Sequence, residues 1–302
     1  MKNIIVLGSG LVGKAIAMDL AKNHKVTSAD INENSLNELK SSGNINTLML
    51  DVTNKAKLAE AVKDFDLVIS AVPGLLGLET MKNVISCQKD LVDISFMPED
   101  VLVLDESAKK NNSTVIMDTG VAPGLPNYIL GYQNELMEIY SAEYYVGGLP
   151  KERVFPFEYK APFSPADVIE EYTRPARFIV NGKVIAKPAM SDEEIIDFPE
   201  AARLEAFNTD GLRSLIKTMG HIPNLKEKTL RYPGHIHLIK ALMAAGFFNK
   251  ENINLNGSKV SPFNLTVKLL FDNWKLEPDD EEFTVLRVII NGIKDGEKIS
   301  LI

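Results

Sequence analysis

Short apolar runs alternate with helix-like patterns over the first 120 residues. The expected strands are residues 3–7, 25–29, 47–50, 66–71, 91–94 and 114–117. Between them, segments such as 11–22, 55–63 and 99–110 have apolar positions at helical spacing. This alternation is typical of parallel βαβ units. It predicts an α/β fold, a Rossmann-type doubly wound parallel sheet with strand order 3-2-1-4-5-6.

The periodicity changes after Pro126. A helical pattern over 128–137 is followed by strand-like runs at 141–146, 178–180 and 284–291, with further helical patterns at 238–247 and 263–274. The sequences at 181–183 (NGK) and 294–296 (KDG) are typical of hairpin turns, because Asn-Gly and Asp-Gly tolerate positive φ. We therefore expect a second, α+β domain built on a mixed sheet, with domain bounds at 1–121 and 122–302.

Composition narrows the class of protein. With 302 residues, 45% hydrophobic and 25% charged, the chain is long enough for two globular domains. No apolar run reaches the roughly 18 residues of a membrane span. The amino terminus has only five apolar residues before its glycines, too few for the apolar region of a secretory signal, so a cytoplasmic location is expected. The net charge of −8 argues against nucleic acid as a partner, and the single Cys87 is interpreted as structural.

A glycine-rich turn lies between the first expected strand and the first expected helix. It reads Gly8-Ser9-Gly10-Leu11-Val12-Gly13, a full G-x-G-x-x-G. The first glycine permits the tight turn, the second lets a pyrophosphate approach the backbone, and the third lets the helix pack closely on the strand. In this strand–turn–helix context the motif predicts a dinucleotide site.

Asp30 ends the second expected strand and bears on the choice of cofactor. A carboxylate there accepts hydrogen bonds from both ribose hydroxyls but repels a 2′-phosphate, and no arginine follows it, so NAD is favoured over NADP. Further cofactor contacts are expected where the third and fourth strands end, at Asp51, Val52, Ala71, Val72 and Pro73. Simple strand termination explains these five residues equally well.

Several long segments resemble the saccharopine dehydrogenase family. They are AVPGLLGLETMKNVISCQKDLVDISFMPED (71–100), DTGVAPGLPN (118–127), VGGLP (146–150), FSPADVIEEYTRPARFIVNGKV (163–184), DGLRS (210–214) and TLRYPGH (229–235). Within that family the chain most resembles the lysine 6-dehydrogenases. The resemblance implies an NAD-dependent amino-acid dehydrogenase that oxidises the ε-amine of L-lysine, or of a closely related diamino acid, to allysine, which cyclises to piperideine-6-carboxylate. It also implies a homodimer or higher homo-oligomer.

The chain departs from the family pattern after its last expected hairpin. Family members usually continue with helices that return to the Rossmann domain, whereas this sequence stops at Ile302. Two alternatives to a lysine dehydrogenase are kept open. One is reductive coupling of an aldehyde with an amino acid, as in saccharopine or carboxynorspermidine formation. The other is an NAD-binding redox sensor without catalysis.

An amino-acid substrate requires a cation for its carboxylate and an anion for each ammonium group. Arg174, Arg213 and Arg231 each stand near a turn or breaker residue in a matching segment, and Arg174 and Arg213 are preferred as carboxylate ligands. Surface ion pairs are the alternative role for each arginine. The other expected substrate contacts are Phe96, Glu171, Tyr172 and His235.

A base is also needed, because an ammonium group must lose a proton before its carbon gives up hydride. Asp93 and Asp118 end the fifth and sixth expected strands, at the carboxyl edge where ligands bind in open α/β sheets, and are the candidate bases. Both could instead hold loop backbone, and Lys160 is a weaker alternative. No metal site is expected, because His235 and His237 fall on a helical pattern where i and i+2 face apart. The segment 118–127 is interpreted as the domain crossover and one wall of the active site.

Overall fold

The computed structural model describes residues 1–199, 201–277 and 279–302. The chain divides into two compact units, Met1–Ile129 and Leu130–Ile302. The predicted division after residue 121 falls earlier in the chain than this one. No helix in the described ranges is both long and apolar enough to cross a membrane.

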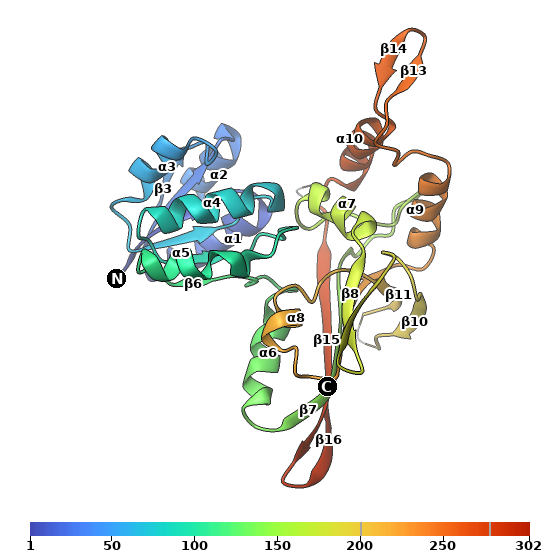
Figure 1. The fold of residues 1–302 in the computed structure, drawn as a ribbon. Helices are drawn as coiled ribbons and strands as arrows, with labels where there is room; N and C mark the ends of the chain where they lie inside the picture. Colours follow the sequence, from blue (N-terminus) through green and yellow to red (C-terminus); the bar gives the residue numbers. More distant parts are fainter. Residues whose placement is uncertain (200, 278) are drawn as a thin grey trace. The chain divides into compact units, whose positions relative to one another are not determined.

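The first unit is built on a six-stranded sheet in the order β3-β2-β1-β4-β5-β6, which confirms the predicted topology (Figure 1). Every neighbouring pair of strands is parallel. The elements are β1 (Asn3–Leu7), α1 (Leu11–Leu20), β2 (Lys25–Asp30), α2 (Glu33–Ser42), β3 (Ile45–Met49), α3 (Lys55–Val62), β4 (Leu67–Ser70), α4 (Gly74–Ser86), β5 (Leu91–Asp93), a 3-10 turn (Val101–Leu104), α5 (Asp105–Lys110) and β6 (Val115–Ile116). Helix α6 (Leu125–Asn134) contains the division between the two units.

Strand β1 shows how the sheet is buried on both faces. Ile4 and Val6 pack in one hydrophobic cluster with residues of α1 and α2. Ile5 and Leu7, which point the opposite way, pack in another cluster with residues of α3, α4 and α5. A strand buried on both faces is continuously apolar, as β1 is from Ile4 to Leu7. The polar residues that end the strands are therefore the ones available for chemistry.

The second unit is built on an eight-stranded mixed sheet, as expected for an α+β domain. Its main path is β10-β11-β12-β7-β15-β16, with β8 paired to β12 and β9 (Figure 1). The elements are β7 (Glu138–Pro150), α7 (Pro165–Thr173), β8 (Ala176–Val180), β9 (Lys183–Lys187), β10 (Glu194–Asp197), β11 (Arg203–Asn208), α8 (Leu215–Thr218), β12 (Asn224–Arg231), α9 (His235–Ala244), β13 (Ile253–Leu255), β14 (Ser258–Val260), α10 (Pro262–Trp274), β15 (Glu282–Lys294) and β16 (Glu297–Leu301).

Strand β12 separates two layers of side chains in this unit. Leu230 packs in a cluster with residues of β7 and β11. Thr229 lies opposite Phe207 in the register with β11, and Phe207 belongs to the other cluster, which also contains residues of α7, α9 and α10. Because side chains alternate along a strand, Glu227, Thr229 and Arg231 share this helix-covered face.

Both predicted hairpin turns are confirmed. Asn181 and Gly182 have positive φ and join β8 to β9, and Asp295 and Gly296 do the same between β15 and β16. Several element predictions are wrong in detail. The pattern at 99–110 is a 3-10 turn followed by α5, because the Asp100 side chain caps a separate start at the Leu102 N–H. The helices expected at 128–137 and 238–247 each begin and end three residues earlier, as α6 and α9.

Candidate functional site

The glycine turn of the first unit is shaped by close backbone contacts. Gly8 has φ +102, and a Cβ on it would lie 2.5 Å from the Ala71 carbonyl oxygen. A Cβ on Gly13 would lie 2.1 Å from the Gly8 carbonyl oxygen. Around Gly10, in contrast, no atom lies within 4 Å of the Cβ position. The turn therefore has two glycines that pack against protein and one that faces open space, which fits a pyrophosphate.

Helix α1 begins at this turn with its N-terminal N–H groups available for an anion. Gly10 is the N-cap, no side chain caps the helix, and its first turn has no acidic residue. Leu11 and Val12 are exposed. A helix N-terminus of this kind binds phosphate through backbone N–H groups and the helix dipole.

Asp30 closes the turn from the end of β2. Its Oδ2 accepts a hydrogen bond from the Ser9 N–H at 2.6 Å, and its Oδ1 accepts from the Asn32 N–H at 2.8 Å. A carboxylate has about four acceptor positions, so these two bonds leave capacity for two hydroxyl donors. Asp51, after β3, is exposed and accepts from the N–H and hydroxyl of Thr53 at 2.9 and 2.6 Å.

Two aspartates lie at the carboxyl edge of the same sheet. Asp93, the last residue of β5, is fully buried, and Asp118, two residues after β6, is 7% exposed. Burial raises the pKa of Asp93 to about 6, and the nearby Asp118 raises it further, while hydrogen bonds from Ser70 and Ser95 lower it. Asp93 is thus a carboxyl group that exchanges a proton close to neutral pH.

The segment after β6 is fastened to the end of β5. The Thr119 hydroxyl donates to the Asp93 carbonyl oxygen at 2.8 Å. Asp118 has φ +51, and Gly120 and Gly124 form a parallel bridge in which a Cβ on Gly124 would lie 1.8 Å from the Gly120 carbonyl oxygen. The glycines are therefore required by close backbone packing, and the segment is a fixed loop rather than a free linker.

Arg231 is the centre of a buried network in the second unit. Its guanidinium donates to Glu171 Oε2 and to Tyr172 Oη, each at 2.9 Å, and lies 4.3 Å from the centroid of the Tyr159 ring. Burial raises the pKa of Glu171, whereas Arg231 lowers it. The carboxylate of α7 thus supplies the opposite charge for a guanidinium that is 2% exposed.

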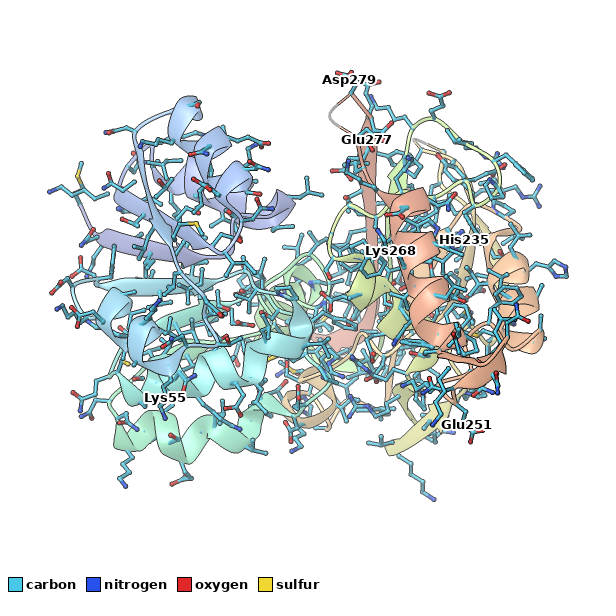
Figure 2. All side chains as sticks on the ribbon, turned by 90° about the horizontal axis from the view of Figure 1, so that it is seen from above. Lys55, His235, Glu251, Lys268, Glu277 and Asp279 are labelled. Atoms are coloured by element: carbon cyan, nitrogen blue, oxygen red, sulfur yellow. The ribbon has the colours of Figure 1, made fainter. Side chains whose placement is uncertain are left out.

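His235, at the start of α9 and labelled in Figure 2, extends this network. Its Nδ1 lies 2.8 Å from the Phe157 carbonyl oxygen, which only accepts, so Nδ1 carries the proton. Its Nε2 therefore accepts from the Tyr172 hydroxyl at 2.9 Å. Burial, with Arg231 nearby, lowers the pKa of His235 to about 3. The imidazole is neutral and has no N–H left for a substrate in this geometry, where it orients the Tyr172 hydroxyl.

Asp210, after β11, forms a second ion-pair group. Its Oδ1 and Oδ2 each accept from the Arg177 guanidinium at 2.8 Å, and Oδ2 also accepts from Arg213 Nη1 at 2.7 Å. Arg213 has φ +47, an unusual conformation for a residue other than glycine. The bidentate contact fixes the plane of the Arg177 guanidinium, and the buried carboxylate also holds Arg213 through its Nη1.

The predicted substrate residues of the second unit lie in three places. Glu171, Tyr172 and His235 surround Arg231, the arginine that the sequence did not favour, whereas Arg213 is held by Asp210. Arg174 caps the end of α7, with its Nη2 3.5 Å from Glu170. The remaining predicted contacts lie in the first unit, where Phe96 and Ala71 are half-buried, Val72 is buried and Pro73 is the N-cap of α4. Val52 is buried after β3.

Sequence reasoning missed Tyr159, Asp210 and Glu227. The run 224–231, NLKEKTLR, has no alternation that singles out Glu227, because the residues on its face of the strand are Leu225, Thr229 and Arg231. No group of three or more His, Cys, Asp or Glu residues suited to a metal ion occurs within the described ranges.

The strand order, the glycine turn and Asp30 define a dinucleotide-binding α/β unit, joined to a mixed-sheet unit with a buried ionic network. Two family models match these parts. Residues 4–116 match the saccharopine dehydrogenase NADP binding domain, and residues 120–301 match the saccharopine dehydrogenase C-terminal domain. The chain belongs to the saccharopine dehydrogenase family, and its first unit is an NAD(P)-binding domain.

Similar proteins agree with this family. The chain is 29% identical over 83% of its length to the mitochondrial alpha-aminoadipic semialdehyde synthase of Mus musculus, but spans 29% of that protein. It is 28% identical over 88% of its length to the saccharopine dehydrogenase [NADP(+), L-glutamate-forming] of Saccharomyces cerevisiae, and spans 63% of it.

Two solved structures share the fold. Apo saccharopine dehydrogenase (L-Glu forming) from Saccharomyces cerevisiae has a TM-score of 0.75 at 21% identity, over 99% of this chain and 84% of that one. Homospermidine synthase from Legionella pneumophila, in complex with NAD, has a TM-score of 0.61 at 13% identity, over 98% of this chain and 76% of that one.

Proposed function

We propose that this chain is an NAD-dependent dehydrogenase that oxidatively deaminates the ε-amine of L-lysine or of a closely related diamino acid. Family membership supports an oxidoreductase acting on an amino-acid-like substrate. The quoted segments 163–184 and 229–235 support a lysine 6-dehydrogenase. The observation that carries the catalytic part is Asp93, a buried carboxyl group whose pKa of about 6 suits proton transfer near neutral pH.

The preference for NAD is also proposed, and Asp30 supports it. Its carboxylate accepts from the loop and retains acceptor capacity for ribose hydroxyls, and Ile31, Asn32 and Glu33 follow it without a cation for a 2′-phosphate. The glycine turn would hold the pyrophosphate. When bound, the nicotinamide accepts a hydride from the carbon that carries the amine.

The proposed reaction has a proton transfer, a hydride transfer and a hydrolysis. The substrate ammonium loses a proton to Asp93, with Asp118 as the neighbouring carboxylate. The carbon beside the nitrogen then loses a hydride, and the resulting substrate iminium adds water and releases ammonia, leaving the aldehyde. Arg213 would pair with the α-carboxylate, since its guanidinium is already oriented by Asp210.

The test is turnover by the purified chain, followed by the absorbance of reduced nicotinamide. L-lysine, ornithine and diaminopimelate are compared at alkaline pH with NAD and with NADP. We expect reduction of NAD with L-lysine, and a loss of about 10²–10⁴-fold in kcat for Asp93→Asn. No reduction with any of the three amines would exclude this substrate class, and tight NAD binding without turnover would favour a redox sensor.

A second candidate is reductive coupling of an aldehyde with an amino acid. The similar proteins, which are saccharopine dehydrogenases and alpha-aminoadipic semialdehyde synthases, favour it. The same assay with saccharopine separates the two candidates. Reduction of the nicotinamide cofactor with saccharopine but not with lysine would replace our proposal. A preference for NADP is expected with that result, because the yeast relative is named as an NADP(+) enzyme.

A further inference from the structure

Glu227 is a buried carboxyl group on β12 to which the proposed chemistry assigns no part. Its side chain is 2% exposed. Its Oε2 accepts from the Thr209 hydroxyl at 2.6 Å and from the Gly211 N–H at 3.1 Å. Its Oε1 lies 3.4 Å from the Thr229 hydroxyl. Both donors to Oε2 belong to the turn that follows β11.

That turn, residues 209–213, is held from two sides. Glu227 binds it through the Thr209 hydroxyl and the Gly211 N–H, and the Tyr144 hydroxyl of β7 donates to the Gly211 carbonyl oxygen at 2.8 Å. A Cβ on Gly211 would lie 2.5 Å from the carboxyl carbon of Glu227. The contact is therefore close enough to require glycine, and the position of Glu227 sets the position of the turn.

The turn carries Asp210 and Arg213. Asp210 accepts hydrogen bonds of 2.7–2.8 Å from the Arg213 and Arg177 guanidinium groups. Arg213, two residues after Gly211, has a left-handed φ. A conformation of this kind persists only where the surroundings enforce it. Support for the turn is therefore also support for the orientation of the Arg213 guanidinium.

The charges that face Glu227 come from several elements. Glu171 of α7 and Asp210 of the turn are carboxylates, and β7 contributes Tyr144, the register partner of Glu227. Arg231 lies two positions beyond Thr229 on the same face of β12. Burial, with Glu171 and Asp210, raises the pKa of Glu227 to about 8, against hydrogen bonds from Thr209 and Gly211. At neutral pH the group is a carboxylic acid, and because Oε2 accepts two bonds, the proton belongs on Oε1.

We propose that Glu227 is a positioning residue, whose neutral carboxyl group holds the 209–213 turn and thereby orients Arg213 for the substrate carboxylate. When the group ionises, its hydrogen bonds from Thr209 and Gly211 strengthen, but the new negative charge repels Asp210 and displaces that carboxylate together with the Arg213 guanidinium that it binds. This inference rests on the proposed function for the role of Arg213. The hold on the turn is a property of the chain alone and is tested separately.

The first test follows the Gly211 amide by NMR, in the wild type and in Glu227→Gln. The Gly211 ¹⁵N and ¹H shifts of the wild type should move in one step with a midpoint near pH 8. The step should be absent in Glu227→Gln and present in Glu205→Gln, a control that removes a carboxylate of β11 bonded to the Gly234 N–H. A Gly211 amide that does not respond between about pH 6 and about pH 9.5 would overturn the inference.

The second test is the pH dependence of KM and kcat for the amino acid. The ratio of variant to wild-type KM cancels the titration of the substrate itself. We expect wild-type KM to rise above about pH 8 relative to Glu227→Gln, by roughly tenfold over one to two pH units, with the change in KM rather than kcat. Glu227→Ala should raise KM at every pH. Glu227→Gln should have the KM of the wild type at neutral pH, because its amide replaces a neutral carboxyl group.

The two proposals fail differently. If no amino acid is turned over while the Gly211 amide titrates as expected, the proposed function is wrong and the hold of Glu227 on the turn stands. If lysine is turned over but wild type and Glu227→Gln share one KM profile, the positioning role is wrong and the proposed function stands.

Discussion

The free energy of unfolding of the second unit should depend on pH through Glu227, and Glu227→Gln should remove that dependence. The ordinary pKa of a glutamate is 4.5, and burial raises the folded-state pKa of Glu227 to about 8. Between these values the folded chain keeps a proton that the unfolded chain has lost. The stability contributed by this group is therefore complete below pH 4.5 and is lost as pH rises toward 8.

The magnitude follows from the two pKa values. One pKa unit corresponds to about 1.4 kcal/mol, so the full interval of about 3.5 units amounts to about 5 kcal/mol. Between about pH 5 and about pH 7.5 the loss is about 3 kcal/mol. His235 acts in the opposite direction, because its folded-state pKa of about 3 lies below its ordinary 6.5, so stability rises with pH across that interval. The difference in free energy of unfolding between Glu227→Gln and the wild type cancels the contribution of His235 and leaves that of Glu227.

Urea unfolding followed by tryptophan fluorescence is the assay. Trp274 is the one tryptophan of the sequence, and it is fully buried in the second unit, so its emission reports the unit that contains Glu227. Relative to wild type, the variant should gain about 3 kcal/mol between about pH 5 and about pH 7.5. Glu297→Gln, at the exposed start of β16, is the control. A difference that stays constant within about 0.5 kcal/mol over this range would refute the burial argument.

The remaining predictions concern the ionic network and the nucleotide turn. Tyr172→Phe should lower the free energy of unfolding in urea by about 2–4 kcal/mol, because it leaves two buried hydrogen-bond partners unpaired. Tyr159→Phe should cost almost nothing, because the Tyr159 hydroxyl has no hydrogen-bond partner in the described part of the chain. Equal costs for the two variants would contradict the network. Asp30→Ala should weaken NAD binding at least about tenfold in calorimetry and reduce the preference over NADP, and unchanged affinity would overturn the cofactor assignment. Gly13→Ala should lower thermal stability by about 1–3 kcal/mol, because its Cβ would meet the Gly8 carbonyl oxygen. Gly10→Ala should lower stability by under about 1 kcal/mol and weaken NAD binding. Similar melting temperatures for the two variants would argue against the packing described for the turn.

The sequence predicted those parts of the fold whose signals are local. The glycine turn, Asp30 and the six short strands of the first unit are each specified within a few residues, and chain connectivity rules then order the strands. Hairpin turns at 181–183 and 294–296 were equally readable, because positive φ selects Asn-Gly and Asp-Gly.

The ionic network could not be predicted in the same way, because its partners come from distant segments. Arg231 meets Glu171 only after β12 pairs with β11 and α7 packs over the sheet. From sequence, Arg213 and Arg231 look alike, each beside a turn residue. Only the tertiary structure separates them, because Arg231 pairs with Glu171 in a buried core whereas Arg213 binds Asp210 in the turn after β11. Most strands of the second unit lacked strict alternation and were missed for a related reason, since context outweighs strand propensity.

The pairing of β7 with β15, along almost the whole of each strand, has a consequence for how the chain is made. The six strands of the first unit are complete once residue 116 has been synthesised, so that unit can fold while translation continues. The second unit cannot, because β7 must wait for a neighbour more than a hundred residues away, and its sheet closes late. Ribosome-bound chains halted before Glu282 should therefore protect the first unit from protease and leave the edge of β7 that faces β15 open to pairing with other strands. The second unit is then the part of this protein most exposed to misassembly during its synthesis.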